Sequence, residues 1–167
     1  MNALDAAGHG RDAATMPMPW TYRHASREWR AFLDDVKEVT GLSSDNMAYT
    51  AVDGVLQVFR ARLTADEGLR FASVLPAVPR AIFVSGWVPQ DPPAAFASRG
   101  ELVREAQALR PDHNLTPDNA IEAVARALRR SVRHADLDRV LASLPPGAEA
   151  FWTIEGADPR DLAPRMA

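Results

Sequence analysis

The sequence predicts an all-α protein in which two tandem homologous helical units of about four helices each pack into one compact bundle. Residues 45–62 and 118–133 each space their apolar residues as one broad helix face. Aligning Asp45 with Asp118 superimposes the two faces. The apolar pairs are Ala48 with Ile121, Ala51 with Val124, Val52 with Ala125, Val55 with Leu128, and Phe59 with Val132. No strand-like alternation of apolar and polar residues occurs in the sequence.

The similarity continues on both sides of these two stretches. Apolar positions in 32–39 match those in 102–109, and ASVLP at 72–76 corresponds to ASLP at 142–145. A unit of about 60 residues that occurs twice indicates an internal duplication. We therefore expect each half to cover the apolar face that the other cannot bury alone.

Composition places the chain in a broad class. With 167 residues, 47% of them hydrophobic, the chain can form one ordinary globular core. A net charge of −3 gives no overall attraction to nucleic acid or to an anionic membrane. The chain has no cysteine, which excludes disulfides and thiolate metal sites. It has neither a run of about 20 apolar residues nor a secretory signal, so the sequence predicts a cytoplasmic protein that does not enter a membrane.

The first predicted segment is a disordered tail over residues 1–19, which are small, polar and interrupted by glycine and proline. The duplicated domain is predicted over 20–153. Its first helix is expected to begin at Arg27 with Ser26 as the cap, and to end at Gly41.

Unit one, residues 26–87, continues with a helix that begins after the serines at 43–44. Gly54 lies inside this helix and indicates a close helix crossing, because a glycine there would otherwise cost stability. Thr64 and Glu67 form a capping box that opens the next helix. A short helix and Trp87 then close the unit.

A proline-rich linker over 88–97 leads into unit two, residues 98–153, which opens with a capping box of Ser98 and Glu101. We expect Thr116 to cap the long helix of this unit. Pro117 would take the first helical position and the helix would run to about Arg133. Residues 154–167 are expected to be a loose C-terminal tail.

These features resemble the bacterial and archaeal family called "domain of unknown function 2267". The similarity is carried by AYTAVDGVLQVFRARLTADEGLRFASVLPAVPRAIFVSGW, by DHNLTPDNAIEAVARALRR and by the duplicated unit. It covers roughly residues 20 to 153 and implies an all-helical fold. No activity, cofactor or catalytic residue is assigned to this family, so the resemblance implies no site residue.

The histidines and carboxylates offer few candidates for catalysis. None of the four histidines has the spacing of a metal-binding motif. Asp112 and His113 either bond their own backbone in a turn or form an acid–base or metal pair, with Asp45 as a third group. We predict no catalytic, metal-binding or cofactor-binding residue, and no cofactor.

A second acidic group lies on the first predicted helix. Asp34, Asp35 and Glu38 are neighbours there and could bind a divalent cation. Arg30 and Lys37 share the same surface, which favours a solvated face held by salt bridges.

The candidate partner-binding residues are arginines and tryptophans. Arg126, Arg129, Arg130 and Arg133 have helical spacing and are expected to form one basic stripe, opposite the apolar face. This stripe is either an ordinary solvated face or a surface for phosphates or an acidic protein.

Trp87 and Trp152 occupy similar places in the two units. They either seal the core or form a docking surface for a partner.

The sequence thus favours a non-enzymatic interaction or regulatory module with a protein partner or self-association. The alternative is a small-ligand- or metal-binding enzyme with a cleft between the two units. The acidic charge balance disfavours nucleic acid as a partner.

Overall fold

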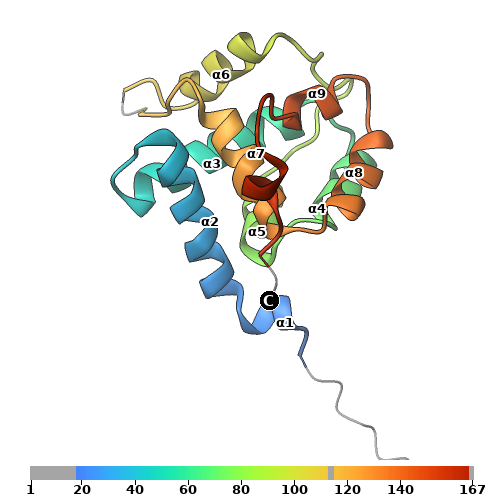
Figure 1. Cartoon of the computed structure of the whole chain (residues 1–167). Helices are drawn as coiled ribbons and strands as arrows, with labels where there is room; N and C mark the ends of the chain where they lie inside the picture. The colour runs from blue at the N-terminus through green and yellow to red at the C-terminus, as the bar shows by residue number, and fades with distance from the viewer. Residues whose placement is uncertain (1–17, 113–114, 166–167) are drawn as a thin grey trace, which may run out of the picture.

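The computed structural model describes residues 18–112 and 115–165, and over these ranges the chain is helical and contains no strand (Figure 1). The all-α prediction is therefore confirmed. The predicted N-terminal tail lies outside the described residues except for 18 and 19. The α-helices are α1 (Trp20–Arg23), α2 (Ala25–Thr40), α3 (Asp45–Arg60), α4 (Ala65–Ala72), α5 (Ala77–Val84), α6 (Arg99–Ala108), α7 (Ala120–Ser131), α8 (His134–Ala142) and α9 (Ala148–Trp152).

Three of the predicted N-terminal caps are present in the structure. Ser44 accepts a hydrogen bond from the backbone N–H of Met47 at the start of α3. Thr64 and Ser98 open α4 and α6, and each forms a complete capping box with the glutamate three residues later. Each bond satisfies a backbone N–H that has no partner within its own helix.

The start of the first helix was predicted wrongly. A separate turn, α1, precedes α2, and Ser26 lies inside α2 and does not cap it. The residue before α2 is His24, whose side chain makes no capping bond. Gly41 ends α2 as expected, with a φ of 74° that glycine adopts without strain.

Both ends of α7 also differ from the prediction. The helix begins at Ala120 rather than at Pro117, and Thr116 is buried instead of capping it. The preceding Asn119 donates its side-chain N–H to the carbonyl of Val39 at the end of α2, at 2.9 Å. Val132 is extended, so α7 ends at Ser131 and Arg133 lies at the start of α8.

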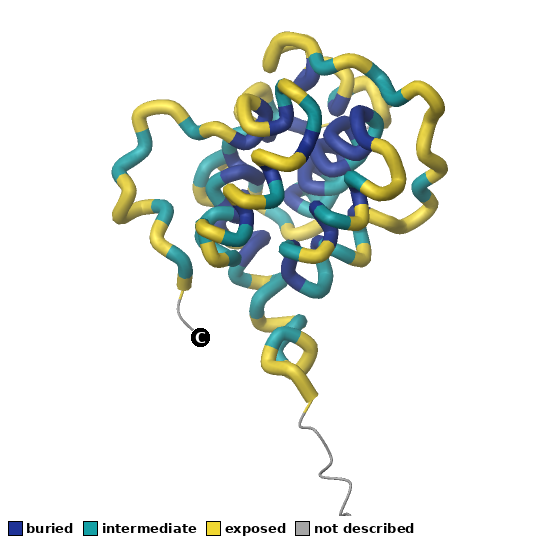
Figure 2. The backbone as a smooth tube through the Cα atoms, turned by 90° about the vertical axis from the view of Figure 1, so that its right-hand side faces the viewer, coloured by how far each residue is buried: buried dark blue, intermediate teal, exposed yellow. Residues whose placement is uncertain are grey.

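The core forms where helices from the two halves of the chain pack together. The most extensive contact joins α2 to α7, and α3 packs against α6. Helix α6 crosses α3 at Gly54, where the sequence predicted a close helix crossing. A Cβ on Gly54 would lie 3.4 Å from the carbonyl oxygen of Ala106, an ordinary contact distance, so an alanine would also fit there. Figure 2 shows the buried residues gathered inside the bundle. The duplication itself stays a prediction, as does the division into units.

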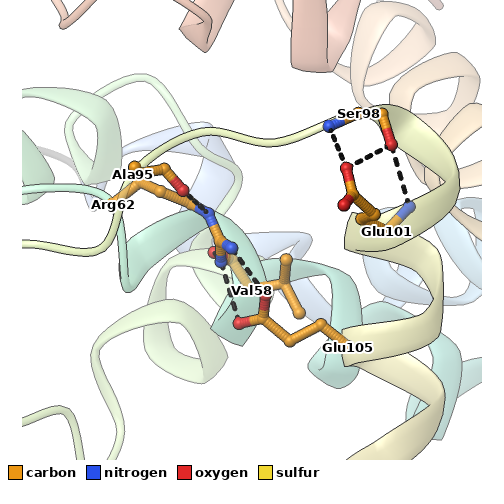
Figure 3. Close-up of polar contacts among 6 residues, drawn as sticks. All are labelled: Val58, Arg62, Ala95, Ser98, Glu101 and Glu105. Carbon is orange, nitrogen blue, oxygen red and sulfur yellow. Dashed lines mark hydrogen bonds and ion pairs between the residues drawn. The ribbon is translucent and has the colours of Figure 1, made fainter.

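A buried arginine just after α3, Arg62, is hydrogen-bonded to α3, to the segment before α6 and to α6 itself (Figure 3). Arg62 has 5% of its side chain exposed and makes two bonds to Glu105 of α6, at 2.9 and 2.5 Å. It also donates to the carbonyls of Val58 and Ala95. These bonds use four of the five N–H donors of the guanidinium.

In the described residues, the end of the chain lies against the bundle through a small number of contacts, where the sequence predicted a loose tail. A 3₁₀ turn, η1 (Pro159–Leu162), lies against α7. His134 Nε2 is 2.8 Å from the carbonyl of Leu162 and 3.0 Å from that of Arg129. Because both backbone carbonyls can only accept a hydrogen bond, the Nε2 atom of His134 carries the proton. Further along, the backbone N–H of Arg165 donates to the carbonyl of Arg130 at 2.9 Å.

Candidate functional site

The four arginines of the predicted stripe have separate neighbours. Arg126 pairs with Glu122 of α7 at 3.0 Å, and Arg129 pairs with Asp138 of α8 at 2.5 Å. Arg130 turns toward α2, where it pairs with Asp35 at 2.5 Å. The stripe is therefore divided among several ion pairs. Arg133 lies beyond the end of α7 and keeps 85% of its side chain exposed.

Two of these arginines, Arg130 and Arg133, line a surface groove with a volume of about 640 Å³. We call it the arginine groove. Its walls come from three parts of the chain: the start of the helical region, the end of α7, and the C-terminal segment. The lining residues are Trp20, Arg27, Glu28, Ala31, Arg130, Ser131, Val132, Arg133, Pro164 and Arg165. Figures 1 and 2 both place α1 and the C-terminal segment at the same end of the molecule.

The groove combines positive charge with apolar surface. Arg27, Arg130, Arg133 and Arg165 supply four cations, whereas Glu28 is the one carboxylate in the lining. Trp20 supplies an aromatic wall that is 38% exposed, and the guanidinium of Arg27 lies 5.5 Å from its ring centre. A cation over an aromatic face is stabilised by the ring quadrupole, which holds both side chains at the rim.

Asp35 lies behind the groove. Only 3% of its side chain is exposed, and Arg130 and Arg165 both bind its Oδ1. Its Oδ2 is buried without a hydrogen-bond partner among the described residues. Burial raises the pKa of the Asp35 carboxyl, and the two arginines oppose that rise. The expectation of a solvated face was thus wrong for Asp35. It fits Asp34, which is 60% exposed and pairs with Lys37 at 3.0 Å.

The two tryptophans differ in exposure. Trp152 is 1% exposed and packs among Phe59, Phe71 and Phe151, with ring centres 5.0 to 5.5 Å away. It seals the core, so it cannot serve as a surface docking residue. Trp87 is partly buried and packs on the core beside Phe83.

The polar loop at 112–113 is described only in part. His113 lies outside the described residues, and Asp112 is exposed. Asp45 is bound to Lys37 at 2.6 Å, and this bond raises the pKa of the Lys37 ammonium. Among the residues that the structure describes, no three His, Cys, Asp or Glu side chains lie together as metal ligands would.

Sequence reasoning identified Arg130 and Arg133, and it placed Asp35 in an acidic group without seeing its arginine partners. It missed Trp20, Arg27 and Arg165. Asp35 and Arg165 are separated by 130 positions in the chain. No local signal links residues so far apart, because only the packing of α2 on α7 brings them together.

The fold and the groove define a helical protein with a basic surface groove. The chain belongs to the family described as "Uncharacterized conserved protein (DUF2267)", whose model matches residues 29–151. The resemblance seen in the sequence is thereby confirmed. No curated protein matches the chain. None of the described helices has the length and apolar character that a membrane crossing requires.

Proposed function

We propose that the protein is a non-enzymatic binding module whose arginine groove takes an acidic segment of a partner protein. The observation that carries the proposal is the groove itself, in which four arginines surround an apolar surface of Trp20, Val132 and Pro164. A segment with carboxylates and one or two apolar side chains would match both features.

The residue types support a protein partner. Tryptophan and arginine are enriched among the side chains that dominate protein–protein binding. Arg133 is 85% exposed and its contact with Asp136 is long, at 3.8 Å. Arg27 lies over the ring of Trp20 and makes no ion pair within the described part of the chain. Both can therefore meet a partner carboxylate without breaking a strong internal pair.

The first experiment measures binding of a short fluorescent peptide in which glutamates alternate with leucine and phenylalanine. We expect wild type to bind it at low salt and to lose affinity as salt rises, because exposed charges are screened. Arg133→Glu and Arg27→Glu are each expected to weaken binding roughly tenfold, as for residues at an interface hot spot.

The matched control is Arg104→Glu, which changes the net charge equally. Arg104 is exposed on α6, at the opposite end of the molecule from α1 (Figure 1). Equal losses in Arg104→Glu and Arg133→Glu would mean that only overall charge matters and would overturn the proposal. Tighter binding of single-stranded DNA than of the peptide would assign the groove to nucleic acid.

A further inference from the structure

Two of the four groove arginines already share a carboxylate inside the protein. Arg130 and Arg165 reach into the groove lining, and both also bind Oδ1 of the buried Asp35. Their side chains remain 32% and 39% exposed, so both arginines are partly open to solvent while they bind Asp35. An incoming carboxylate would therefore meet guanidinium groups that Asp35 partly neutralises.

The pairing at Asp35 leaves polar groups poorly satisfied. Two guanidinium groups converge on Oδ1, while Oδ2 has no partner among the described residues. An arginine and a carboxylate bind most strongly through two parallel hydrogen bonds. A partner carboxylate at the groove surface can offer Arg165 that geometry. Burial also disfavours the charged form of Asp35 and raises its pKa.

Arg165 lies on a segment that few contacts hold in place. No residue of η1 is buried. Two attachments fix the backbone near it: His134 to the carbonyl of Leu162, and the N–H of Arg165 to the carbonyl of Arg130. Segments with little buried apolar surface open at low energetic cost. The C-terminal segment can therefore move without unfolding the bundle.

We propose that Asp35 is an internal competitor for the acidic partner: a carboxylate that enters the arginine groove takes Arg165 from Asp35, and residues 158–165 shift as the groove fills. The inference rests on the proposed function of the groove. Asp35 thereby limits the affinity of the groove, and Arg165 carries the effect.

The test compares wild type, Asp35→Asn, Arg165→Gln and the double variant, with the same fluorescent glutamate peptide. We expect Asp35→Asn to bind roughly tenfold tighter, a size in keeping with the coupling of close charge pairs. Arg165→Gln should bind more weakly than wild type. The double variant should show no gain over Arg165→Gln, since the released arginine is absent.

Glu38→Gln is the control for general electrostatics, because Glu38 lies 3.6 Å from Arg130 but is 74% exposed. An equal gain in Glu38→Gln and Asp35→Asn, or a gain that persists without Arg165, would overturn the competition. If Asp35→Asn does not fold, the competition can be tested in wild type by following the NMR signals of the arginine Nε–H groups as the peptide is added. A signal of Arg165 that saturating peptide leaves unchanged would contradict the inference.

The outcomes separate the two proposals. Suppose that wild type binds the peptide, that Arg133→Glu weakens binding, and that Asp35→Asn binds no more tightly. The groove function would then stand and the competition by Asp35 would be discarded. Binding by Asp35→Asn alone would support the competition directly. No binding by either protein would overturn both.

Discussion

Gly68 is a residue whose lack of a side chain has a direct structural role. It lies within α4, and the indole of Trp87 occupies the space beside it. A Cβ built on Gly68 would lie 2.2 and 2.3 Å from two ring atoms of Trp87. Trp87 is thus seated against α4 in a way that no larger residue at position 68 allows.

We expect Gly68→Ala to destabilise the protein by about 1–3 kcal/mol, the usual cost of inserting a methyl group into a packed site. Urea denaturation, monitored by tryptophan fluorescence, measures the loss. We also expect the fluorescence spectrum of the native protein to change, because Trp87 moves. Gly100→Ala is the matched control, since its nearest atom is 3.8 Å away on Arg104. The control should gain up to about 1 kcal/mol from helix propensity. Equal stability of the two variants would contradict the packing of Trp87 on Gly68.

The start of α6 is an element whose stability depends on pH. In the capping box of α6, Glu101 accepts hydrogen bonds from the side chain and backbone N–H of Ser98. The side-chain bond from Ser98 is the main reason that the pKa of Glu101 is lowered. Since the folded state holds the charged form, the added stability is present above the ordinary pKa of a glutamate. It is lost as pH falls through the lower pKa of the folded protein.

We therefore expect the difference in unfolding free energy between wild type and Ser98→Ala to be largest at neutral pH and to narrow in acid. Thermal denaturation between neutral pH and pH values below the ordinary glutamate range measures it. Ser44→Ala is the control, because Ser44 caps α3 through Met47 with no glutamate. That variant should lose about 0.5–2 kcal/mol at every pH. A pH-independent loss in Ser98→Ala would be the contrary result.

The sequence was most informative where a signal is local. The pairs Thr64–Glu67 and Ser98–Glu101 are three residues apart, so their capping boxes could be predicted without tertiary structure. Thr116 also has the residue type of a cap, but tertiary packing buries it and α7 starts later. The short turn α1 has no side-chain cap and gave no signal.

The candidate site was less predictable than the helices. Asp34 and Asp35 are adjacent and chemically identical, yet one is exposed and the other buried, because only Asp35 faces α7 and the C-terminal segment. That difference depends on which helix packs against α2. Helical periodicity reports an apolar face but not the identity of its neighbour.

The bundle as a whole depends on contacts between its two halves. Arg62 of the first half and Glu105 of the second form such a contact, with the guanidinium buried and the carboxylate 43% exposed. Removing the carboxylate charge would leave a buried cation without its ionic partner.

We expect Glu105→Gln to lower the unfolding free energy by about 1–3 kcal/mol, the cost of leaving a buried polar group poorly satisfied. Urea denaturation measures the loss, and hydrogen exchange should rise in α6. Asp66→Asn serves for comparison, since Asp66 pairs with Arg70 but is 84% exposed. An exposed pair contributes at most about 1 kcal/mol. If both variants lost the same amount, the Arg62 network would not be holding the halves together.

The packing of α2 on α7 also has a consequence for synthesis on the ribosome. Asp35 and Arg130, which join these helices, are separated by 95 positions, and Asn119 reaches back 80 positions to Val39. Helices α3 and α5 cover part of α2 early, but its most extensive contact, with α7, can form only after most of the polypeptide has emerged. We expect a nascent chain that stalls before α7 to leave part of the apolar side of α2 open to chaperones.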